Sequence, residues 1–304
     1  MIYNKGEKRV KRKYFILFLG VVLIGIGFLG YVMFGQTGEK KAISAIDLEQ
    51  LEEDFNSKKY KPYVETFKTD ENKVNDSSKK ILFVGNSLIY NHDLPAVFFN
   101  LLKEMKKESE VYVIAKGSAS LSDFSNQKND LGSTLHTVLE EERWDYVILQ
   151  ENTKNIVSKH IEKITMDAVK QLDKKIKKNG ANTAFFMTWA PKNGVVRNHT
   201  NIGLEEVQKN ISDNYHQLAK EVDGMLFSIG DVFVECMKRY PNIELWEVDQ
   251  SHASKEGIYL AACVMYVSIF QQSLENCNYT DEIEKDIADT LKKLASEIVL
   301  SKSK

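Results

Sequence analysis

The pattern of apolar and polar positions after residue 80 alternates between two kinds of segment. Short, almost continuous apolar runs predict strands, because a strand that is covered on both faces has no polar side. These runs lie at 81–84, 111–115, 146–149, 183–188 and 225–228. Segments with helical periodicity separate or follow them, at 94–107, 133–142, 159–179, 204–222, 253–271 and 280–301.

Alternation of strands and helices is typical of a parallel sheet with right-handed crossover connections. The sequence therefore predicts an α/β fold, a three-layer α/β/α sandwich with about five parallel strands. In such sheets ligands bind outside the carboxyl ends of the strands. The polar residues that directly follow each predicted strand are thus the first place to look for chemistry.

The N-terminal segment has a different pattern. Residues 14–35 carry no charge, and at about 1.5 Å rise per residue a helix of this length crosses a hydrocarbon core of roughly 30 Å. Lysines and arginines at positions 5, 8, 9, 11, 12 and 13 precede it, which favours an N-terminus inside the cell. A cleaved signal peptide is the competing interpretation, although its apolar region is normally about 7–15 residues long.

We therefore expect four parts along the chain. A basic cytoplasmic tail at 1–13 precedes an uncleaved transmembrane signal anchor at 14–35. A stalk or linker at 36–79 then leads to a domain at 80–304 that lies outside the cytoplasm. The protein is predicted to be a single-pass protein of the cell membrane, bound to it through residues 14–35.

Overall charge excludes some classes of partner. The 304 residues include 41 basic and 43 acidic ones, and after the N-terminal tail there is no basic stripe interleaved with aromatic residues. We expect no nucleic-acid partner. The three cysteines show no metal-binding spacing, and we expect no metal or organic cofactor.

Four strand ends carry residues that could act together. The first strand ends at Ser87, the second at Gly117 and the third at Asn152, while Asp249 and His252 precede the helix at 253–271. A serine hydroxyl becomes a good nucleophile when a base removes its proton, and a histidine oriented by a carboxylate is such a base. The sequence predicts Ser87 as nucleophile, His252 as base and Asp249 as its partner.

A tetrahedral intermediate also needs hydrogen-bond donors at its oxyanion. The candidates are the backbone N–H groups of Ser87 and Gly117 and the side-chain amide of Asn152. Glycine permits a close backbone approach because it has no Cβ.

These residues resemble the four blocks of the SGNH, or GDSL-type, hydrolases, in the same order along the chain: Gly85-Asn86-Ser87, Gly117, Asn152 and Asp249-x-x-His252. The stretches VGNSLIYNHDLP, WDYVILQENT and DQSHASKEGIYLAACVMY are similar to a subgroup with Leu-Gln-Glu in its third block. The resemblance implies a flavodoxin-like sandwich and an esterase, lipase, thioesterase or carbohydrate deacetylase. Two positions depart from the family pattern, since Asn86 replaces an aspartate and Gln150 replaces a glycine, which leaves Gln150 as the alternative third oxyanion donor.

Each of these residues also has a simpler interpretation. Ser87 could only cap a helix, Asp249 and His252 could only begin one, and Asn152 could only close a turn. Four further residues at the same edge are possible substrate-binding residues: Asn86, Gln150, Glu151 and Trp189. Glu151 is a candidate for binding a substrate hydroxyl or a metal, and Trp189 is either a sugar platform or a core residue.

The hypothesis drawn from these observations is a membrane-anchored, extracytoplasmic serine esterase. Its expected substrate is an acylated small molecule or a cell-surface carbohydrate with short acyl groups such as O-acetyl. An acyltransferase with the same three residues and a non-catalytic surface binding module are the alternatives.

Overall fold

The computed structural model describes residues 46–47, 63–68 and 78–301. The predicted membrane span at 14–35 and most of the predicted stalk lie outside these residues. Among the helices that the structure does describe, none combines the length and the apolar composition that crossing a membrane requires.

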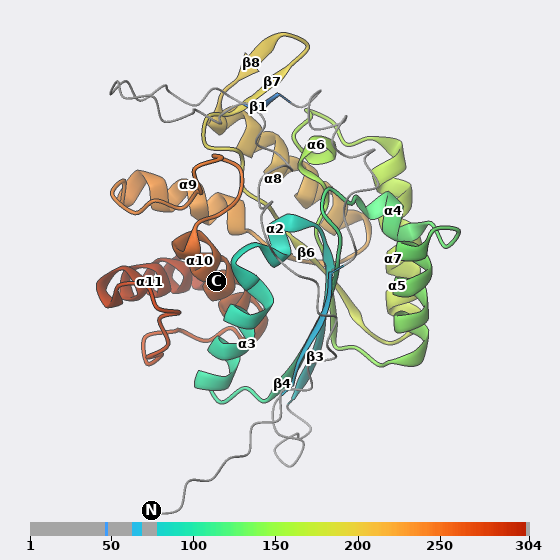
Figure 1. Ribbon diagram of the computed structural model, residues 1–304, viewed down its shortest axis with the longest axis horizontal. Coiled ribbons are helices and arrows are strands. Elements are labelled where there is room, and N and C mark those ends of the chain that lie inside the picture. Colours follow the sequence, from blue (N-terminus) through green and yellow to red (C-terminus); the bar gives the residue numbers. More distant parts are fainter. Residues whose placement is uncertain (1–45, 48–62, 69–77, 302–304) are drawn as a thin grey trace, which may run out of the picture. The chain divides into compact units, whose positions relative to one another are not determined.

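A six-stranded sheet forms the centre of the domain (Figure 1). The five predicted parallel strands are present: β3 (Lys79–Gly85), β4 (Ser109–Ala115), β5 (Tyr146–Leu149), β6 (Asn182–Phe186) and β9 (Met225–Phe227). A sixth strand, β2 (Tyr63–Lys68), pairs antiparallel with β4 at one edge. The strand order is β2-β4-β3-β5-β6-β9, so the sheet is mostly parallel, as the apolar runs predict.

Strand β2 corrects the predicted boundary of the domain, because it lies inside the segment 36–79 for which the sequence predicts a stalk. Its sequence, YVETFK, has no continuous apolar run, since an edge strand has few core contacts to make. Val64 is exposed, while Phe67 packs against Phe99 with ring centroids 5.9 Å apart. Only the pairing with β4 identifies this segment as part of the sheet.

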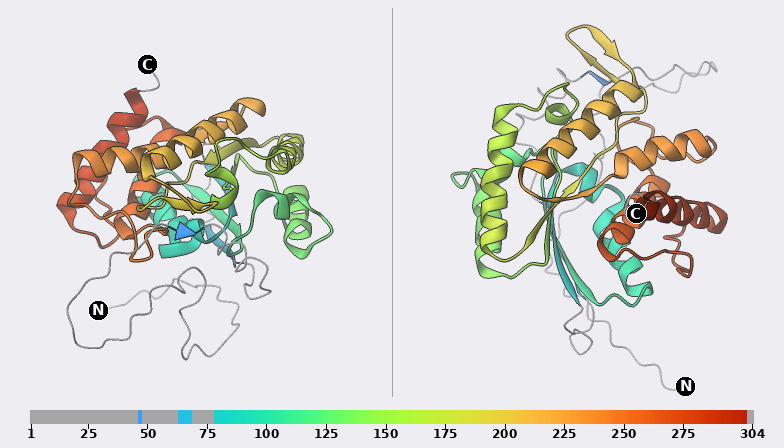
Figure 2. Two further views of the ribbon diagram at one scale, coloured as in Figure 1. Left: turned by 90° about the horizontal axis from the view of Figure 1, so that it is seen from above. Right: turned by 180° about the vertical axis from the view of Figure 1, so that it is seen from behind.

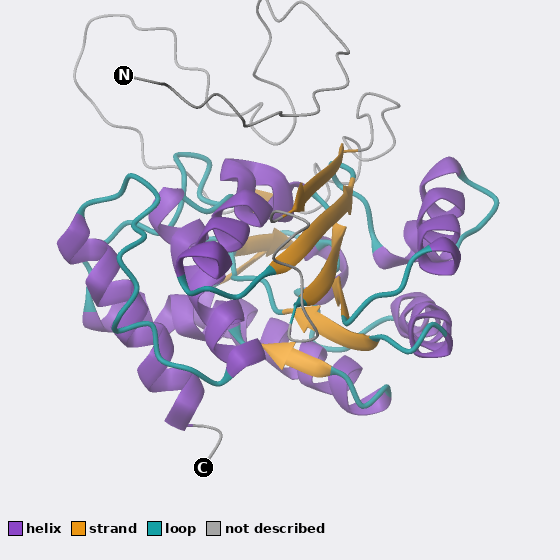
Figure 3. Ribbon diagram, turned by 90° about the horizontal axis from the view of Figure 1, so that it is seen from below, coloured by secondary structure: helices purple, strands orange, loops and turns teal. Residues whose placement is uncertain are grey.

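Helices cover both faces of the sheet, which gives the three predicted layers (Figures 1 and 3). One face packs against α3 (Leu94–Glu104), α9 (Ile229–Arg239), α10 (Lys255–Phe270) and α11 (Lys285–Ser301). The other packs against α4 (Leu121–Ser125), α5 (Asp130–Glu141), α7 (Lys163–Lys178) and α8 (Leu204–Glu221). Side chains of β3 alternate between these two cores because successive strand residues point to opposite faces: Ile81 and Phe83 contribute to one, Leu82 and Val84 to the other.

Two helices illustrate what the periodicity can and cannot predict. Helix α10 is apolar on all sides and is buried from Gly257 to Ser268, because it packs between the sheet and other helices. Helix α9 is absent from the sequence-based prediction. A single residue, Ser228, separates it from the end of β9, so strand and helix merge into one apolar stretch in the sequence.

The strand order creates a crevice at one point of the sheet. From β3 the chain passes to β4 on one side, and from β4 it crosses back to β5 on the other side of β3. The carboxyl ends of β3 and β5 therefore flank the topological switch point, where open α/β sheets bind ligands. The short helices α2 (Ser87–Tyr90) and α6 (Thr153–Ile156) begin at this edge, in the upper half of Figure 1.

A small second sheet lies near the same edge. Strands β7 (Val195–Arg197) and β8 (Thr200–Ile202) form a hairpin that projects beyond the helices (Figures 1 and 2). Strand β1 (Ile46–Asp47) pairs with β7 in parallel. The sequence pattern does not predict the hairpin, because its strands of three residues carry no apolar run.

Candidate active site at the carboxyl edge of the sheet

Ser87 stands where β3 gives way to helix α2, and the residue at the end of β3 must be small. A Cβ on Gly85 would lie 2.4 Å from Gln150 Oε1 and 2.6 Å from Ile89 Cδ1, distances at which real side chains do not pack. The lack of a Cβ at Gly85 lets β3 and the residue after β5 approach closely. This close approach fixes where the chain leaves the sheet and hence where Ser87 begins the helix.

Asn86, the residue between them, ties three strand-end segments together. Its backbone N–H donates to Gln150 Oε1 at 2.8 Å, and its side-chain Nδ2 donates to the Ala119 carbonyl at 3.0 Å. Its Oδ1 accepts from the Leu88 N–H at 3.2 Å and so caps α2. With every polar group of its side chain engaged and only 4% of the residue exposed, Asn86 positions the Ser87 corner and is not free to bind substrate.

The structure brings Ser87, His252 and Asp249 into one hydrogen-bonded chain. His252 Nε2 lies 2.9 Å from Ser87 Oγ, and His252 Nδ1 lies 2.6 Å from Asp249 Oδ2. Because the carboxylate can only accept, Nδ1 carries the proton and Nε2 is left to accept the serine proton. Ser87 and His252 are 165 residues apart in the sequence, and the fold alone makes them neighbours.

The Asp249 carboxylate is well suited to orient this imidazole. Burial by itself would raise its pKa, but the hydrogen bond and charge of His252 together with two backbone N–H groups hold the pKa of Asp249 below its ordinary value. Those N–H groups belong to Ser251 and His252, and both lie 2.9 Å from Oδ1. The group therefore stays ionised, and an ionised partner stabilises the imidazolium that forms when His252 accepts a proton.

The loop that carries Asp249 and His252 is held from several directions. The Glu247 N–H donates to the His252 carbonyl at 2.8 Å, and the Lys192 N–H donates to the Gln250 carbonyl at 2.9 Å. The Glu247 side chain also pairs with the ring of His92, in the short 3₁₀ turn (Asn91–Asp93) after α2. This contact links the segment that carries Ser87 to the loop that carries His252, and no spacing in the sequence points to it.

The candidate oxyanion donors lie on two neighbouring loops. Gly117 and Ser118 form a turn after β4, in which the Ala119 N–H donates to the Lys116 carbonyl at 3.0 Å. Ser118, rather than the glycine, has the left-handed backbone, with φ of 61°. Asn152 Nδ2 donates to the Ser118 carbonyl at 2.7 Å, which connects the loop after β5 to this turn. Gly117 and Asn152 are thus held side by side next to the β3 end.

Gln150, the alternative donor, has no exposed surface. Its Oε1 accepts from the Asn86 N–H and its Nε2 donates to the Glu151 carbonyl. Both amide nitrogens already donate one hydrogen bond inside the protein, but Gln150 is completely buried whereas Asn152 is partly exposed, which favours Asn152 as the side-chain donor. Gln150 connects the ends of β3 and β5 through its hydrogen bond to Asn86. Because it is completely buried, it does not contact substrate as the sequence suggested.

Trp189 is a core residue, which is one of its two predicted interpretations, and the other, a sugar platform, is wrong. It is 2% exposed, and its ring stacks on Phe233 with a centroid distance of 4.6 Å and an interplanar angle of 5°. Its Nε1 donates to the Ser251 carbonyl at 2.8 Å. A platform needs an open face for a sugar ring, whereas both faces of this indole are covered.

Glu151, the last of the possible substrate-binding residues, is completely buried and reaches no solvent. Its Oε1 accepts from the N–H of Asn152 at 2.5 Å and from two further donors. In the described part of the chain, no group of three or more histidine, cysteine, aspartate or glutamate side chains is arranged to hold a metal ion.

Two solved structures are similar in fold to this chain over most of their own length. A candidate SGNH hydrolase from Slackia heliotrinireducens is similar over 63% of this chain and 99% of its own, with a TM-score of 0.53 and 23% identity. This chain has the SGNH hydrolase fold. A DUF4886 family protein from Bacteroides uniformis is similar over 75% of this chain and 96% of its own, with a TM-score of 0.59 and 16% identity.

The comparison confirms the SGNH resemblance that the sequence motifs predicted, at the level of the fold. Neither the family models nor the curated proteins include a match to this chain. The roles of individual residues in this SGNH fold therefore rest on the geometry described above.

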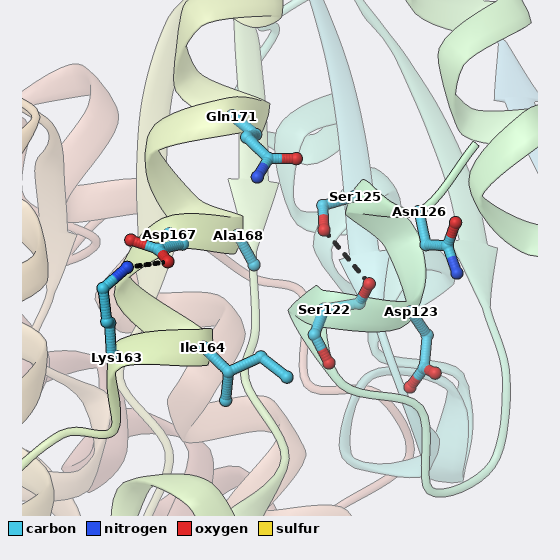
Figure 4. A pocket seen from close by; sticks show the side chains of 9 residues that line it. All are labelled: Ser122, Asp123, Ser125, Asn126, Lys163, Ile164, Asp167, Ala168 and Gln171. Atoms are coloured by element: carbon cyan, nitrogen blue, oxygen red, sulfur yellow. Dashed lines mark hydrogen bonds and ion pairs between the residues drawn. The ribbon is translucent and has the colours of Figure 1, made fainter. Parts of the chain in front are cut away.

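A separate pocket of about 660 Å³ lies between α4 and α7 (Figure 4). Ser122, Ser125 and Asn126 line one side of it and Gln171 the other, while Lys163 and Asp167 pair with each other on α7. Its lining includes none of the predicted site residues.

Proposed function

We propose that this protein is a membrane-anchored serine esterase that cleaves short-chain ester bonds. The observation that carries the proposal is the hydrogen-bonded chain from Ser87 Oγ through His252 to Asp249 at the topological switch point. A serine capping a helix would need no imidazole 2.9 Å from its hydroxyl. A hydroxyl, a base and an ionised orienting group in series are what nucleophilic acyl transfer requires.

The reaction follows from this arrangement. Ser87 Oγ attacks the ester carbonyl while His252 Nε2 takes its proton, and the carbonyl oxygen becomes an oxyanion. The Ser87 and Gly117 N–H groups and the Asn152 amide would stabilise that charge. Collapse of the intermediate breaks the bond to the alcohol, which leaves with the proton from His252. Water activated by the same imidazole then attacks the acyl-enzyme, releases the acid and restores Ser87.

Membrane attachment and substrate are further parts of the proposal. The uncharged segment 14–35, with basic residues before it, supports an anchor with the SGNH domain outside the cytoplasm. At that position the acylated compounds within reach include cell-surface carbohydrates, and we propose O-acetyl groups on such carbohydrates as the natural substrate. With Trp189 buried, recognition of the sugar falls to other residues around the edge of the sheet.

The test is hydrolysis of p-nitrophenyl esters from acetate to octanoate by the full chain in detergent, beside Ser87→Ala and His252→Ala. We expect both variants to lose at least about a thousandfold in kcat while remaining folded. Ser268→Ala is the matched control, because the hydroxyl of that buried serine donates to the Val264 carbonyl of its own helix. Acetate released from an acetylated polysaccharide would extend the result to the natural substrate.

A fluorophosphonate probe supplies a second measurement that does not depend on the ester chosen. We expect it to label Ser87 in the unaltered protein and to leave Ser87→Ala unlabelled. Lack of both turnover and labelling in the unaltered protein would overturn the proposal. Transfer of the acyl group to an added sugar in preference to water would instead identify a transferase that uses the same three residues.

A further inference from the structure

The side chain of Glu151 stands out because a completely buried carboxylate joins the two loops that carry the candidate oxyanion donors. Its Oε1 lies 2.5 Å from the Asn152 N–H and 3.2 Å from Asn155 Nδ2, both in the segment after β5. The same oxygen lies 3.3 Å from the N–H of Leu121, the first residue of α4, the helix that follows the Gly117 turn after its N-cap Ser120. One oxygen atom therefore accepts from both loops.

The backbone of Glu151 is fixed as well. Its N–H donates to the hydroxyl of Tyr215, a fully buried residue of α8, at 3.0 Å. The contact anchors Glu151 to a helix that packs beneath this part of the sheet. Because this contact restrains the main chain of Glu151, its carboxylate oxygen is restrained as well. The hydrogen bonds of that oxygen then fix its distance to the Asn152 and Leu121 N–H groups.

A carboxylate at this position is costly, which indicates that it does more than fill space. Oε2 is buried and has no hydrogen-bond partner in the described part of the chain. Burial raises the pKa of Glu151 to about 7, against the opposing effect of its three hydrogen bonds, and the nearby negative charge of Asp123 raises it further. A glutamine could accept the same three bonds without burying a charge. Hydrogen bonds to an ionised acceptor are, however, roughly twice as strong as neutral ones.

We propose that Glu151 is a positioning residue for the ester cleavage suggested above: by accepting from both loops, it holds the Gly117 turn and Asn152 at a fixed separation around the oxyanion. The direct Asn152–Ser118 contact ties the same loops at a second point. Together, these two sets of hydrogen bonds restrain the relative position of the loops more than either set alone would. The inference rests on the proposed function, but its effect on loop order can be measured without any substrate.

The experiment compares Glu151→Gln, Glu151→Leu and the unaltered full chain in detergent. Amide hydrogen exchange reports on residues 117–121 and 151–155, and p-nitrophenyl acetate turnover is followed from pH 5 to 9. Glutamine keeps the acceptor oxygen and removes the charge, whereas leucine removes the acceptor. Ser296→Ala is the control, because it also removes a buried acceptor for a backbone N–H, that of Leu274, in the region of α10 and α11.

We expect Glu151→Leu to speed exchange in both loops and to lower kcat about a hundredfold with little change in KM, because a small displacement of donors acts on the transition state. Glu151→Gln should lose about fivefold to tenfold, since its hydrogen bonds are weaker. In the unaltered protein the dependence of kcat on pH should include the ionisation of Glu151, whose pKa is raised to about 7, and this contribution should be absent from Glu151→Gln. The control should change neither exchange in the loops nor kcat.

Two results would overturn the proposal. Unchanged exchange in both loops of Glu151→Leu would show that the carboxylate does not order them. Faster exchange with unchanged kcat would show that it orders them without serving the reaction. Failure of the proposed function is detected separately, since the unaltered protein would then neither hydrolyse the ester nor react with a fluorophosphonate at Ser87.

Discussion

The indole Nε1 of Trp189 donates a hydrogen bond of 2.8 Å to the backbone carbonyl of Ser251, the residue directly before His252. The indole itself is held by stacking on Phe233, whose ring meets Trp246 edge-on at 5.6 Å. Trp246 Nε1 in turn donates to the Ala190 carbonyl at 3.1 Å. An aromatic cluster in the core thus contributes, with Asp249 and the backbone contacts of the loop, to the position of the imidazole.

Trp189→Phe should therefore weaken catalysis without emptying the core. Phenylalanine can keep the stacking on Phe233 but leaves the buried Ser251 carbonyl without its donor, at a cost of about 1–3 kcal/mol in the free energy of unfolding. We expect kcat for p-nitrophenyl acetate to fall about tenfold, because the loop that carries His252 relaxes.

Trp144→Phe is the matched control for this substitution. Trp144 Nε1 also donates to a backbone carbonyl, that of Val138 at 3.3 Å, and its ring packs edge-on against Tyr112. We expect a loss of stability in urea denaturation with kcat unchanged. An equal fall in kcat for both variants would mean that Trp189 affects activity only through overall stability.

Gly85→Ala should disturb the corner that presents Ser87. The added Cβ would lie 2.4 Å from Gln150 Oε1, so either the glutamine or the strand end must move. We expect a loss of about 1–3 kcal/mol in the free energy of unfolding and slower labelling of Ser87 by a fluorophosphonate. Gly203→Ala is the control, since nothing lies within 4 Å of a Cβ there and its φ is −71°. Equal labelling rates for both variants would contradict this account.

Asp249→Asn should reduce turnover while keeping the loop folded. The amide oxygen can still accept from the Ser251 and His252 N–H groups, but it no longer carries the charge that stabilises the imidazolium and selects its tautomer. We expect kcat to fall about a thousandfold or more. Asp145→Asn provides a comparison at the amino end of the sheet, where Asp145 accepts from the Lys80 N–H at 2.8 Å. A fall below about tenfold for Asp249→Asn would exclude the proposed role of Asp249.

The pH dependence of stability should carry a contribution from Glu151. Its pKa is raised in the folded protein from 4.5 to about 7, so between these values the native state holds a proton that the unfolded state has released. The free energy of unfolding should therefore fall as pH rises through this window, by up to about 3 kcal/mol from this group. Above pH 7 the contribution no longer changes.

The contribution of His136 to stability has the opposite pH dependence. The effect of Glu151 must therefore be measured as the difference in the free energy of unfolding between the unaltered protein and Glu151→Gln. Burial and the charge of Lys175 lower the pKa of His136, which makes its contribution to stability rise with pH up to its ordinary value of 6.5. Urea denaturation at pH 5, 6, 7 and 8 of the unaltered protein and Glu151→Gln isolates the Glu151 term. We expect the stability difference between the two proteins to change in that window, and a constant difference would contradict the raised pKa.

Removal of residues 1–35 should release the protein from membranes. If segment 14–35 is an anchor, the full chain sediments with the membrane fraction and the shortened chain stays in the supernatant. Protease added to intact cells should then degrade the SGNH domain of the full chain, because we place this domain outside the cytoplasm. Recovery of the full chain in the soluble fraction would exclude the proposed anchor. If the protease degrades the protein only after the cells have been lysed, the proposed orientation is excluded.

The sequence by itself determined the layers of the fold and where the candidate site would lie. Apolar runs and helical periodicity are local signals, and they located the five parallel strands and most of the helices. Since parallel strands end at one edge, the order of strands and helices is enough to predict that Ser87, Gly117, Asn152 and the Asp249–His252 segment converge. The local signals failed for β2 and for the β7–β8 hairpin, where few side chains contact the core.

Only the tertiary structure decided what the other polar and aromatic residues at this edge do. Gln150, Glu151 and Trp189 follow strands as a ligand-binding residue would, and their sequence positions do not distinguish a surface role from a buried one. Their partners, Asn86, Leu121 and Ser251, lie 64, 30 and 62 residues away in the chain. Burial depends on contacts between such distant segments, which the sequence does not reveal. Gln150, Glu151 and Trp189 are therefore buried residues that hold the site in position, although their sequence positions suggested substrate binding.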